Sequence, residues 1–368
     1  MSIQFSRRDL VRGMVGTAVG LALAPTAFSQ VGAPPGKIAL RYNENPYGPS
    51  PAARKAAYEA VDQGAYYADT IQENLLRTIA DKHDLTLDNM VLSSGSNEAL
   101  QAAHVAFGRK GHVLMPSLTY TDHIPYSKTM GVKIRTVPLR PDLSIDLGAM
   151  AAAVDDDVSL VYICNPNNPT GLTLDGDELR EFCRTVGQQT IVIIDEAYNE
   201  LTKDPRYTSM VDLIHDNENI IVFRTFSKIF GMAGMRVGYA MTRPELARTI
   251  ARHVMSWPNV AGLAAALASI NDDEFIRFSR GKIFEGRSMV NETFRRNGIE
   301  PLPSQTNFVF ADIGRNAAEF RQRMAERNVL IRGNYDALPS HVRVSMGLVE
   351  EVAVFQDVFD EVFASYGG

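Results

Sequence analysis

The strongest constraint on the fold is a series of six short apolar segments, with helical patterns between most of them. Each segment is too short for a helix and suits a strand buried on both faces. The six segments are Met90–Leu92, Val113–Met115, Ile134–Val137, Leu160–Ile163, Ile191–Ile194 and Ile220–Phe223. Strands that alternate with helices in this way form parallel sheets. The sequence therefore predicts an α/β fold with a mostly parallel central sheet that is covered on both faces by helices.

The segments that flank this series have a different character. A helix from Thr70 to about His83 begins with a capping-box spacing, Thr70 to Glu73. Beyond Pro258, a long helical pattern over 271–297 ends at Gly298. Shorter patterns follow it: a segment at Asn307–Ala311, a helix near 315–327, strands near 329–332 and 342–346, and a final helix at 349–365. We expect four parts: a signal peptide (1–29), an extended arm (30–52), a large domain (53–262) and a smaller C-terminal α/β domain (263–368).

The first residues resemble an export signal. Arg7-Arg8 precedes an apolar run from Gly13 to Ala24, and the small residues Ala27 and Ser29 suit cleavage after Ser29. The apolar run is too short to span a bilayer as a helix. The arginine pair resembles a twin-arginine signal, which implies a bacterial protein that the twin-arginine machinery exports in folded form to the periplasm. If this segment is only a basic helix, the protein is cytoplasmic.

Composition excludes several classes of function. The chain has 368 residues, of which 45% are hydrophobic, and a net charge of −6. Such a chain is globular, and the acidic balance argues against a nucleic-acid partner. Its two cysteines, Cys164 and Cys183, belong to no CxxC motif, and no HExxH motif occurs. We therefore expect no metal site and two reduced, buried cysteines.

Two of the loops that follow predicted strands are rich in small polar residues. Ligands of parallel sheets bind beyond the carboxyl ends of the strands, so these loops are candidate sites. Gly95-Ser96-Asn97 opens a helix, where free backbone N–H groups suit a phosphate, although Ser and Asn are also ordinary cap residues. The Asn165–Gly171 loop contains two Asn-Pro steps and can aim the Asn168 amide at a ligand, although it could be a purely structural turn.

Two further loops carry charges in apolar surroundings. Asp195-Glu196-Ala197-Tyr198 follows a buried strand, and a buried Asp195 needs a cationic or hydrogen-bonded partner. Lys228 stands alone in an apolar, glycine-rich stretch, eight residues before Arg236. Burial lowers the pKa of a lysine, which is what a Schiff-base lysine requires.

Together, these motifs resemble the class I/II pyridoxal-phosphate (PLP) aminotransferases of fold type I, in particular the histidinol-phosphate aminotransferase branch. The resemblance runs from Asn43–Pro49 to Arg343–Gly347. It implies that Lys228 holds PLP as an imine and that Asp195 pairs with the pyridine nitrogen. Tyr198 and Asn168 would bind the oxygen of the ring hydroxyl. The resemblance implies a phosphate site made by Gly95, Ser96, Asn97, Thr225, Ser227 and Arg236.

The resemblance also implies a substrate site and a partner. Arg343 would bind the substrate α-carboxylate, and Arg332 would lie at the distal end of the substrate. Asn45 and Tyr47 are further substrate-binding candidates. Tyr67 matches a tyrosine that reaches the PLP phosphate of the neighbouring subunit, which implies a homodimer with shared sites.

The sequence departs from the family at the residue that stacks on the PLP ring. That residue usually lies two positions after the proline that follows a strand, and here Leu118 occupies the position. We expect Tyr120 to stack on the ring after a small shift of the loop. Otherwise, Leu118 packs there.

The expected function is an aminotransferase that moves an amino group between an L-amino acid and a 2-oxo acid by a ping-pong mechanism. Because an exported enzyme has little access to a phosphorylated intermediate, we expect an unphosphorylated amino acid, with an aromatic one as a candidate. The alternatives are a true histidinol-phosphate aminotransferase, a PLP-dependent lyase, racemase or decarboxylase on the same fold, and a PLP-carrying binding or regulatory protein.

Overall fold

The structure is a computed structural model that describes residues 36–216 and 219–366. Residues 38–368 form one compact unit. The predicted signal peptide at 1–29 lies outside the described residues. Within the described part of the chain, no helix combines the length and the apolarity that crossing a membrane requires.

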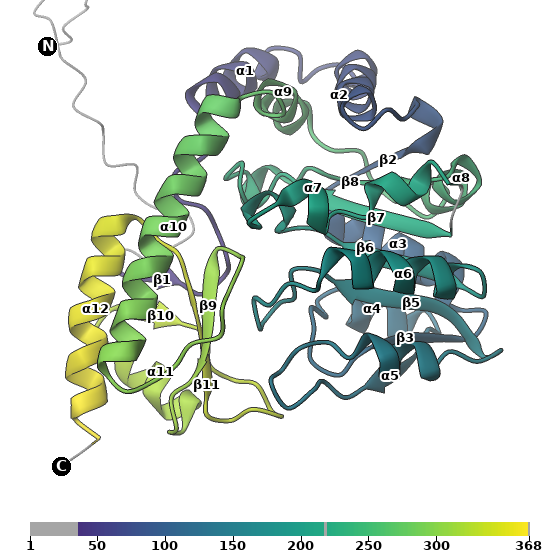
Figure 1. Ribbon diagram of the computed structural model, residues 1–368. Coiled ribbons are helices and arrows are strands. Elements are labelled where there is room, and N and C mark those ends of the chain that lie inside the picture. The colour runs from purple at the N-terminus through teal and green to yellow at the C-terminus, as the bar shows by residue number, and fades with distance from the viewer. Residues whose placement is uncertain (1–35, 217–218, 367–368) are drawn as a thin grey trace, which may run out of the picture. The chain divides into compact units, whose positions relative to one another are not determined.

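A seven-stranded sheet forms the centre of this unit (Figure 1). Its strands are, in spatial order, β2 (Met90–Ser93), β8 (Gly238–Thr242), β7 (Ile220–Thr225), β6 (Ile191–Asp195), β5 (Val158–Cys164), β3 (His112–Pro116) and β4 (Lys133–Val137). The six predicted strands are confirmed, and they share one direction. Strand β8 is an addition, and it runs antiparallel to both β2 and β7. The sequence did not predict β8, because this strand directly follows the glycine-rich stretch that ends at Arg236 and its residues read as a continuation of that loop.

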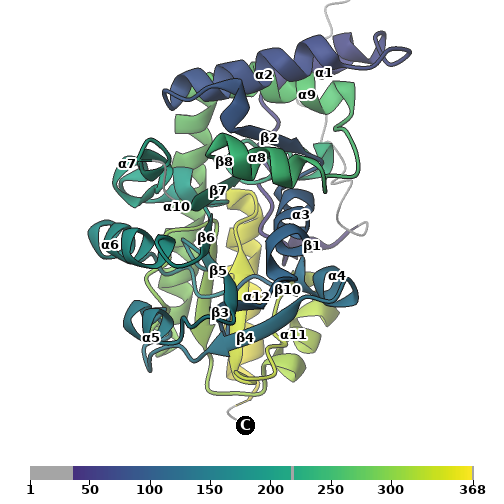
Figure 2. The same ribbon diagram turned by 90° about the vertical axis from the view of Figure 1, so that its right-hand side faces the viewer.

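Helices cover both faces of the sheet, as predicted (Figure 2). One face carries α3 (Ser96–Gly108), α4 (Ile124–Thr129) and α8 (Pro244–Ala251), and the other carries α5 (Leu147–Ala152), α6 (Gly176–Gly187) and α7 (Pro205–Thr208). Apart from the edge strand β4, the strands are almost entirely buried on both sides, which explains why they read as continuous apolar runs. Both cysteines are buried and reduced, as expected.

Three further helices, α1 (Pro51–Val61), α2 (Asp69–Lys82) and α9 (Val260–Ser269), pack against one another near β2. The predicted capping box at Thr70 is wrong. Helix α2 begins at Asp69 after Ala68, so Thr70 lies inside its first turn. The side chain of Glu73 instead binds Arg77, one turn further along the helix.

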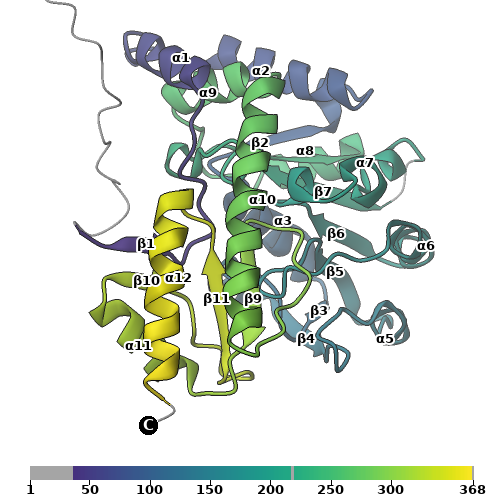
Figure 3. The ribbon, with the colours of Figure 1, turned by 60° about the vertical axis from the view of Figure 1, so that its left-hand side comes forward.

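The C-terminal part of the unit holds two small sheets and three helices. One sheet pairs β9 (Phe308–Asp312) with β11 (His341–Ser345), and the other pairs β1 (Ile38–Leu40) with β10 (Val329–Ile331). Helices α10 (Asp273–Arg296), α11 (Ala317–Glu326) and α12 (Val349–Ala364) pack beside them (Figure 3). These elements confirm the predicted ones to within about two residues. Gly298 follows the C-cap of α10 at a φ of 75°, as a glycine after a helix commonly does.

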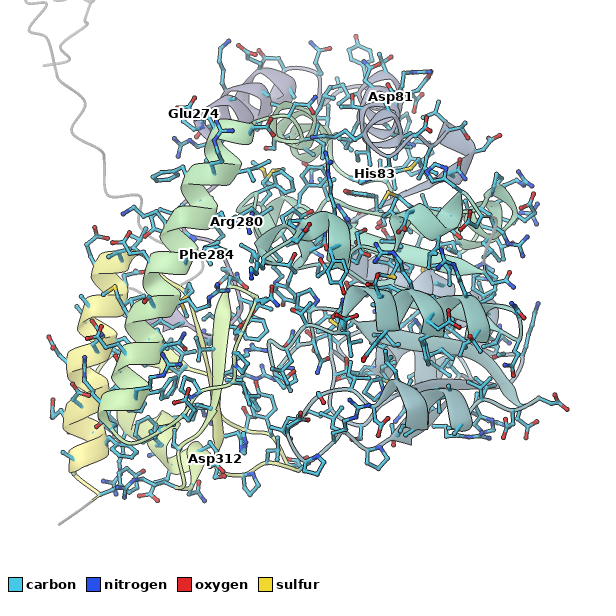
Figure 4. All side chains as sticks on the ribbon, viewed as in Figure 1. Asp81, His83, Glu274, Arg280, Phe284 and Asp312 are labelled. Carbon is cyan, nitrogen blue, oxygen red and sulfur yellow. The ribbon has the colours of Figure 1, made fainter. Side chains whose placement is uncertain are left out.

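Segments distant in sequence connect these parts. Strand β1, from the predicted arm, joins the C-terminal strand β10. Arg280, labelled on α10 in Figure 4, donates to the carbonyl oxygen of Thr202 in the loop after β6. The predicted division between residues 262 and 263 falls inside α9, which packs on α1 and α2. The division into a large and a small domain stays a prediction.

A buried ion pair fixes the carboxyl ends of β6 and β7. The guanidinium of Arg224 lies 2.8 Å from the carboxylate of Glu196, and both side chains are almost fully buried. Ser209 Oγ and the Met210 N–H also donate to this carboxylate. Burial works against the charge of the arginine, but the carboxylates of Glu196 and Glu200 raise its pKa.

We expect Arg224→Met to lower the free energy of unfolding by about 3–5 kcal/mol, because it leaves the buried carboxylate of Glu196 without its cation. The matched control is Arg77→Met, which removes an exposed pair with Glu73 and should cost less than about 0.5 kcal/mol. Urea unfolding of both variants measures the difference. Equal costs for the two variants would contradict this prediction.

Candidate active site

One cavity of about 560 Å³ lies at the carboxyl ends of β5, β6 and β7. The structure brings twelve of the sequence-predicted site residues to its walls. They are Ser96, Asn97, Tyr120, Asn168, Asp195, Tyr198, Thr225, Ser227, Lys228, Arg236, Arg332 and Arg343. The loops after the strands therefore meet where parallel topology predicts.

Lys228 follows β7 and reaches into this cavity. Its Nζ donates to the backbone oxygen of Asn43 at 3.1 Å and lies 5.4 Å from the centre of the Tyr198 ring. Burial, together with the positive charges of Arg343 and Arg236, lowers the pKa of Lys228 to about 8, although the negative charge of Asp195 opposes the shift. The predicted fall in this pKa is confirmed, and a sizeable fraction of the amine is neutral near pH 8.

Asp195 ends β6 and is only 2% exposed. Its Oδ2 accepts a hydrogen bond from the hydroxyl of Tyr162 at 3.2 Å, and its Oδ1 accepts one from the Ala197 N–H at 3.2 Å. Burial nevertheless raises the pKa of Asp195 to about 6. A carboxylate in this state is stabilised by a cationic group placed beside it in the cavity.

The hydroxyl of Tyr198 lies between two amides. Its oxygen accepts hydrogen bonds from Asn43 Nδ2 at 3.0 Å and from Asn168 Nδ2 at 3.3 Å. These two bonds occupy the acceptor capacity of the oxygen, so the hydroxyl proton is left to donate to another group. Burial raises the pKa of Tyr198, which keeps that proton in place.

The start of α3 and the loop after β7 supply hydrogen-bond donors to one side of the cavity. Gly95 precedes α3 at a φ of 80°, and a Cβ there would clash with the guanidinium of Arg236. Arg236 has a φ of 58° and donates to the backbone oxygens of Ala233 and Ser94. A helix N-terminus, hydroxyl groups and a guanidinium together suit an anion. The hydroxyl groups belong to Ser96, Thr225 and Ser227.

Two arginines from the C-terminal part line the opposite side. The guanidinium of Arg343 donates to Asn168 Oδ1 at 2.6 Å and to the Arg41 carbonyl at 2.9 Å. The backbone of Arg332 pairs with that of Arg343. Among the described residues, the buried Nε atom of each arginine has no hydrogen-bond partner.

Leu118 and Tyr120 both line the cavity. The hydroxyl of Tyr120 donates to Asn97 Oδ1 at 3.3 Å, and its ring lies 5.8 Å from that of His123. Which of these two side chains stacks on a bound ring stays a prediction.

Four predicted residues lie outside the lining of the cavity. Gly95 shapes it through Arg236, and Tyr67 is 83% exposed with its ring edge against Trp257. Asn45 donates to the Ile229 carbonyl and to Ser279 Oγ, both at 2.7 Å. The hydroxyl of Tyr47 accepts a hydrogen bond from the Val349 N–H at 2.8 Å. The structure therefore directs Asn45 and Tyr47 away from the cavity, and both serve to connect elements of the fold.

Two residues with direct contacts to the site are not among those predicted from the sequence. One is Asn43, whose backbone oxygen binds Lys228 and whose amide binds Tyr198. Its φ of 56° is a conformation that asparagine tolerates better than most residues. The other is Tyr162, inside an apolar strand. For Asn43, the only signal in the sequence is its place directly before the Glu-Asn-Pro run. Nothing in the local sequence marks Tyr162.

Comparisons with known proteins agree with this geometry. The family described as aminotransferase class I and II matches residues 35–355. The histidinol-phosphate aminotransferase of Brevibacillus brevis is 33% identical over 329 residues, which cover 88% of this chain and 90% of that protein. The histidinol-phosphate aminotransferase of Symbiobacterium thermophilum is 36% identical over 319 residues, which cover 85% of this chain and 87% of that protein. Among solved structures, this chain is similar to the histidinol-phosphate aminotransferase of Sinorhizobium meliloti in complex with pyridoxal-5'-phosphate. The TM-score is 0.82 and the sequence identity is 28%, and the match covers 89% of this chain and 91% of that one.

We expect Lys228, in protein freed of bound small molecules, to react with an amine-selective reagent with a midpoint near pH 8. Arg343→Gln should move this midpoint to higher pH, because removing a positive charge stabilises the ammonium form. Arg332→Gln is the control and should leave the midpoint close to that of the wild type. Mass spectrometry of the peptide that contains residue 228 measures the extent of reaction. A midpoint above pH 10 in the wild type would contradict the prediction.

Proposed function

Since the chain belongs to the class I and II aminotransferase family and is a histidinol-phosphate aminotransferase-like transaminase, we propose that its cavity binds pyridoxal 5'-phosphate. We further propose that its substrate is an unphosphorylated L-amino acid. The observation that carries the proposal is that Lys228, Asp195 and Arg236 line the same cavity. An amine, a carboxylate and a guanidinium that lay apart could not serve one cofactor.

The polar groups of the cavity fit the parts of this cofactor. Asp195 is a buried carboxylate that a protonated ring nitrogen would neutralise. The free hydroxyl proton of Tyr198 suits the oxygen of the ring hydroxyl, and the amide of Asn168 lies beside it. The donors around the start of α3, together with Arg236, suit the phosphate.

When bound, pyridoxal phosphate supplies an aldehyde that joins to amino groups and a ring that accepts electrons. The residues of the chain do the remaining work. Asp195 would hold the proton on the ring nitrogen. Lys228 Nζ, with its pKa near 8, would take a proton from the substrate and return it. The planar guanidinium of Arg343 would bind the α-carboxylate.

An amino acid without phosphate suits the opening of the cavity. Asp122 and Asp336 line it and are exposed, and two carboxylates there disfavour a phosphate dianion. The rings of Tyr42 and Tyr335 also line it and offer apolar surface to an aromatic side chain.

A second candidate substrate is histidinol phosphate. The relatives reported above are named for it, and Arg332 adds a second guanidinium beside Arg343. Paired guanidinium groups bind phosphate well.

A homodimer is supported by an exposed aromatic surface. Tyr66, Tyr67, Met255 and Trp257 are between 64% and 83% exposed and line a second hollow of about 590 Å³. Large apolar side chains exposed together mark an interaction surface. We propose that two copies of the chain meet here and that Tyr67 reaches the phosphate of the partner subunit's cofactor.

Export is proposed from the sequence alone, since residues 1–29 lie outside the described residues. The twin-arginine machinery would carry the folded protein to the periplasm. Fractionation of producing cells tests this, because an Arg7→Lys, Arg8→Lys double variant should stay in the cytoplasm.

We expect the full chain, loaded with pyridoxal phosphate, to transaminate an L-amino acid such as phenylalanine with 2-oxoglutarate. Its kcat/KM for the amino acid should exceed that for histidinol phosphate by at least about tenfold, a difference of about 1.4 kcal/mol in transition-state binding. Steady-state kinetics with both donors measures the ratio. Lys228→Ala is the control without turnover. The opposite ratio would favour the second candidate substrate, and turnover of neither donor would contradict the proposal.

We expect sedimentation to give a molecular mass of twice 40.6 kDa for the full chain. Tyr66→Asp should shift the equilibrium from dimer toward monomer, because it places a charge in the apolar surface. Val354→Asp on α12 is the control, since Val354 is 45% exposed outside that surface. Trp257 is the only tryptophan of the chain, so its emission should move to longer wavelength as the dimer dissociates. A wild-type monomer at micromolar concentration would overturn the proposed interface.

A further inference from the structure

A fully buried tyrosine lies behind Asp195. Tyr162 is 0% exposed and belongs to β5, two residues before Cys164, which pairs with Asp195 in the sheet. Residues two apart in a strand point to the same face, so Tyr162 and Asp195 share the face that α3 and α4 cover. The hydroxyl of Tyr162 donates to Asp195 Oδ2 at 3.2 Å. Tyr162 does not line the cavity, so it meets the carboxylate from the side of the protein interior.

Two buried histidines hold the ring of Tyr162. His104, on α3, and His123, at the start of α4, are both 0% exposed, and their Nε2 atoms lie 3.2 Å apart. Their rings lie 5.6 Å and 4.9 Å from the ring of Tyr162. The pair therefore closes the space that the tyrosine would need in order to turn away from Asp195.

The hydrogen bonds of the pair determine its protonation. His104 Nδ1 lies 2.8 Å from the Leu100 carbonyl, so this nitrogen donates. His104 Nε2 then accepts, and His123 Nε2 donates to it. Burial lowers the pKa of His104 to about 4 and that of His123 well below its usual value. Both rings are neutral at working pH, so they support Tyr162 without adding charge near Asp195.

We propose that Tyr162 is a positioning residue that holds Asp195 as a carboxylate turned toward the cavity, and that the His104–His123 pair keeps the tyrosine in place. The inference rests on the proposed function, because the partner of this carboxylate is the ring nitrogen of the cofactor. Tyr162 touches neither cofactor nor substrate and acts only through Asp195.

The charge balance around Asp195 shows why this hydroxyl matters. Burial favours the neutral acid, and the hydrogen bond from Tyr162 is the largest effect that favours the carboxylate. The Ala197 N–H and Lys228 act in the same direction, and Glu196 acts against them. The titratable groups that interact electrostatically with Asp195 are Tyr120, Tyr162, Cys164, Glu196, Tyr198 and Lys228, and of these Glu196 points away from it, toward Arg224. Loss of the Tyr162 hydroxyl therefore raises the pKa of Asp195 above about 6.

The charge of Asp195 determines how cofactor binding depends on pH. Below its pKa, Asp195 is a neutral acid and cannot pair with a protonated ring nitrogen. A higher pKa therefore weakens cofactor binding at neutral and mildly acidic pH. Above that pKa, the carboxylate forms in the variant as well, and affinity recovers.

The test is the affinity of Tyr162→Phe for pyridoxamine 5'-phosphate, measured by calorimetry between pH 5.5 and 9. This probe has no aldehyde, so the reaction with Lys228 does not contribute. We expect the Kd of the variant to be about fivefold weaker than that of the wild type near pH 6 and about eightfold weaker at pH 5.5, which corresponds to a shift of about one pKa unit. At pH 9 the two Kd values should agree within about twofold.

Two variants serve as controls. Tyr239→Phe removes another buried tyrosine hydroxyl, on β8 beside Arg224, and should keep the wild-type pH profile. His123→Phe leaves the Tyr162 hydroxyl in place but breaks the histidine pair. It should shift the profile in the same direction as Tyr162→Phe and by less, so it tests the proposal even if Tyr162→Phe folds poorly.

The outcomes are distinguishable. Identical pH profiles for Tyr162→Phe and the wild type would overturn the inference and leave the proposed function intact. An equal loss of affinity at every pH would also overturn it, because that is the effect of disturbed packing. Failure of the wild type to bind the probe would overturn the proposed function, and this inference with it.

Discussion

Two opposite charges share one cavity, in which Asp195 is buried and Lys228 is partly buried, and much of the surrounding structure serves to keep them there. The ammonium of Lys228 and the carboxylate of Asp195 each lose hydration on burial, so their pKa values move toward each other, to about 8 and about 6. Neither group is far from changing its charge at physiological pH. Small contributions from neighbouring residues therefore decide which form is present.

Asn43 connects the three segments that surround these charges. Its backbone oxygen accepts from Lys228, its amide donates to Tyr198, and Ser345 Oγ on β11 bonds to its side chain and backbone. Arg343 lies two residues before Ser345 on the same strand and donates to Asn168, which also binds Tyr198. Arg343 and Lys228 are therefore connected by hydrogen bonds that run through Asn168, Tyr198 and Asn43.

Most of the sheet could be predicted because its central strands are apolar on both faces, and such runs need no information beyond the local sequence. The exception is β8, where Gly238-Tyr239 continues a loop that is rich in glycine. The loop residues of the site could be predicted from their place after strands, together with the resemblance to a known family. Asn45 and Tyr47 show the limit of that reasoning, since a motif gives the residues but not the direction in which each side chain points.

Asn43 and Tyr162 could not be identified from the sequence, because their roles depend on partners that lie far along the chain. Asn43 is 155 residues from Tyr198, and Tyr162 is 33 residues from Asp195. Within an apolar strand, a tyrosine is indistinguishable from a packing residue. Only the register of β5 against β6 brings its hydroxyl to a carboxylate.

The adjacent acids Asp195 and Glu196 illustrate the same point at the smallest scale. Consecutive residues at the end of a strand point in opposite directions, so only one of them can face Tyr162 and the cavity. Glu196 is directed to Arg224, whose guanidinium neutralises it within the protein. The carboxylate at the cavity is therefore left to be neutralised by a bound cation, and this is the condition that a protonated cofactor ring would meet.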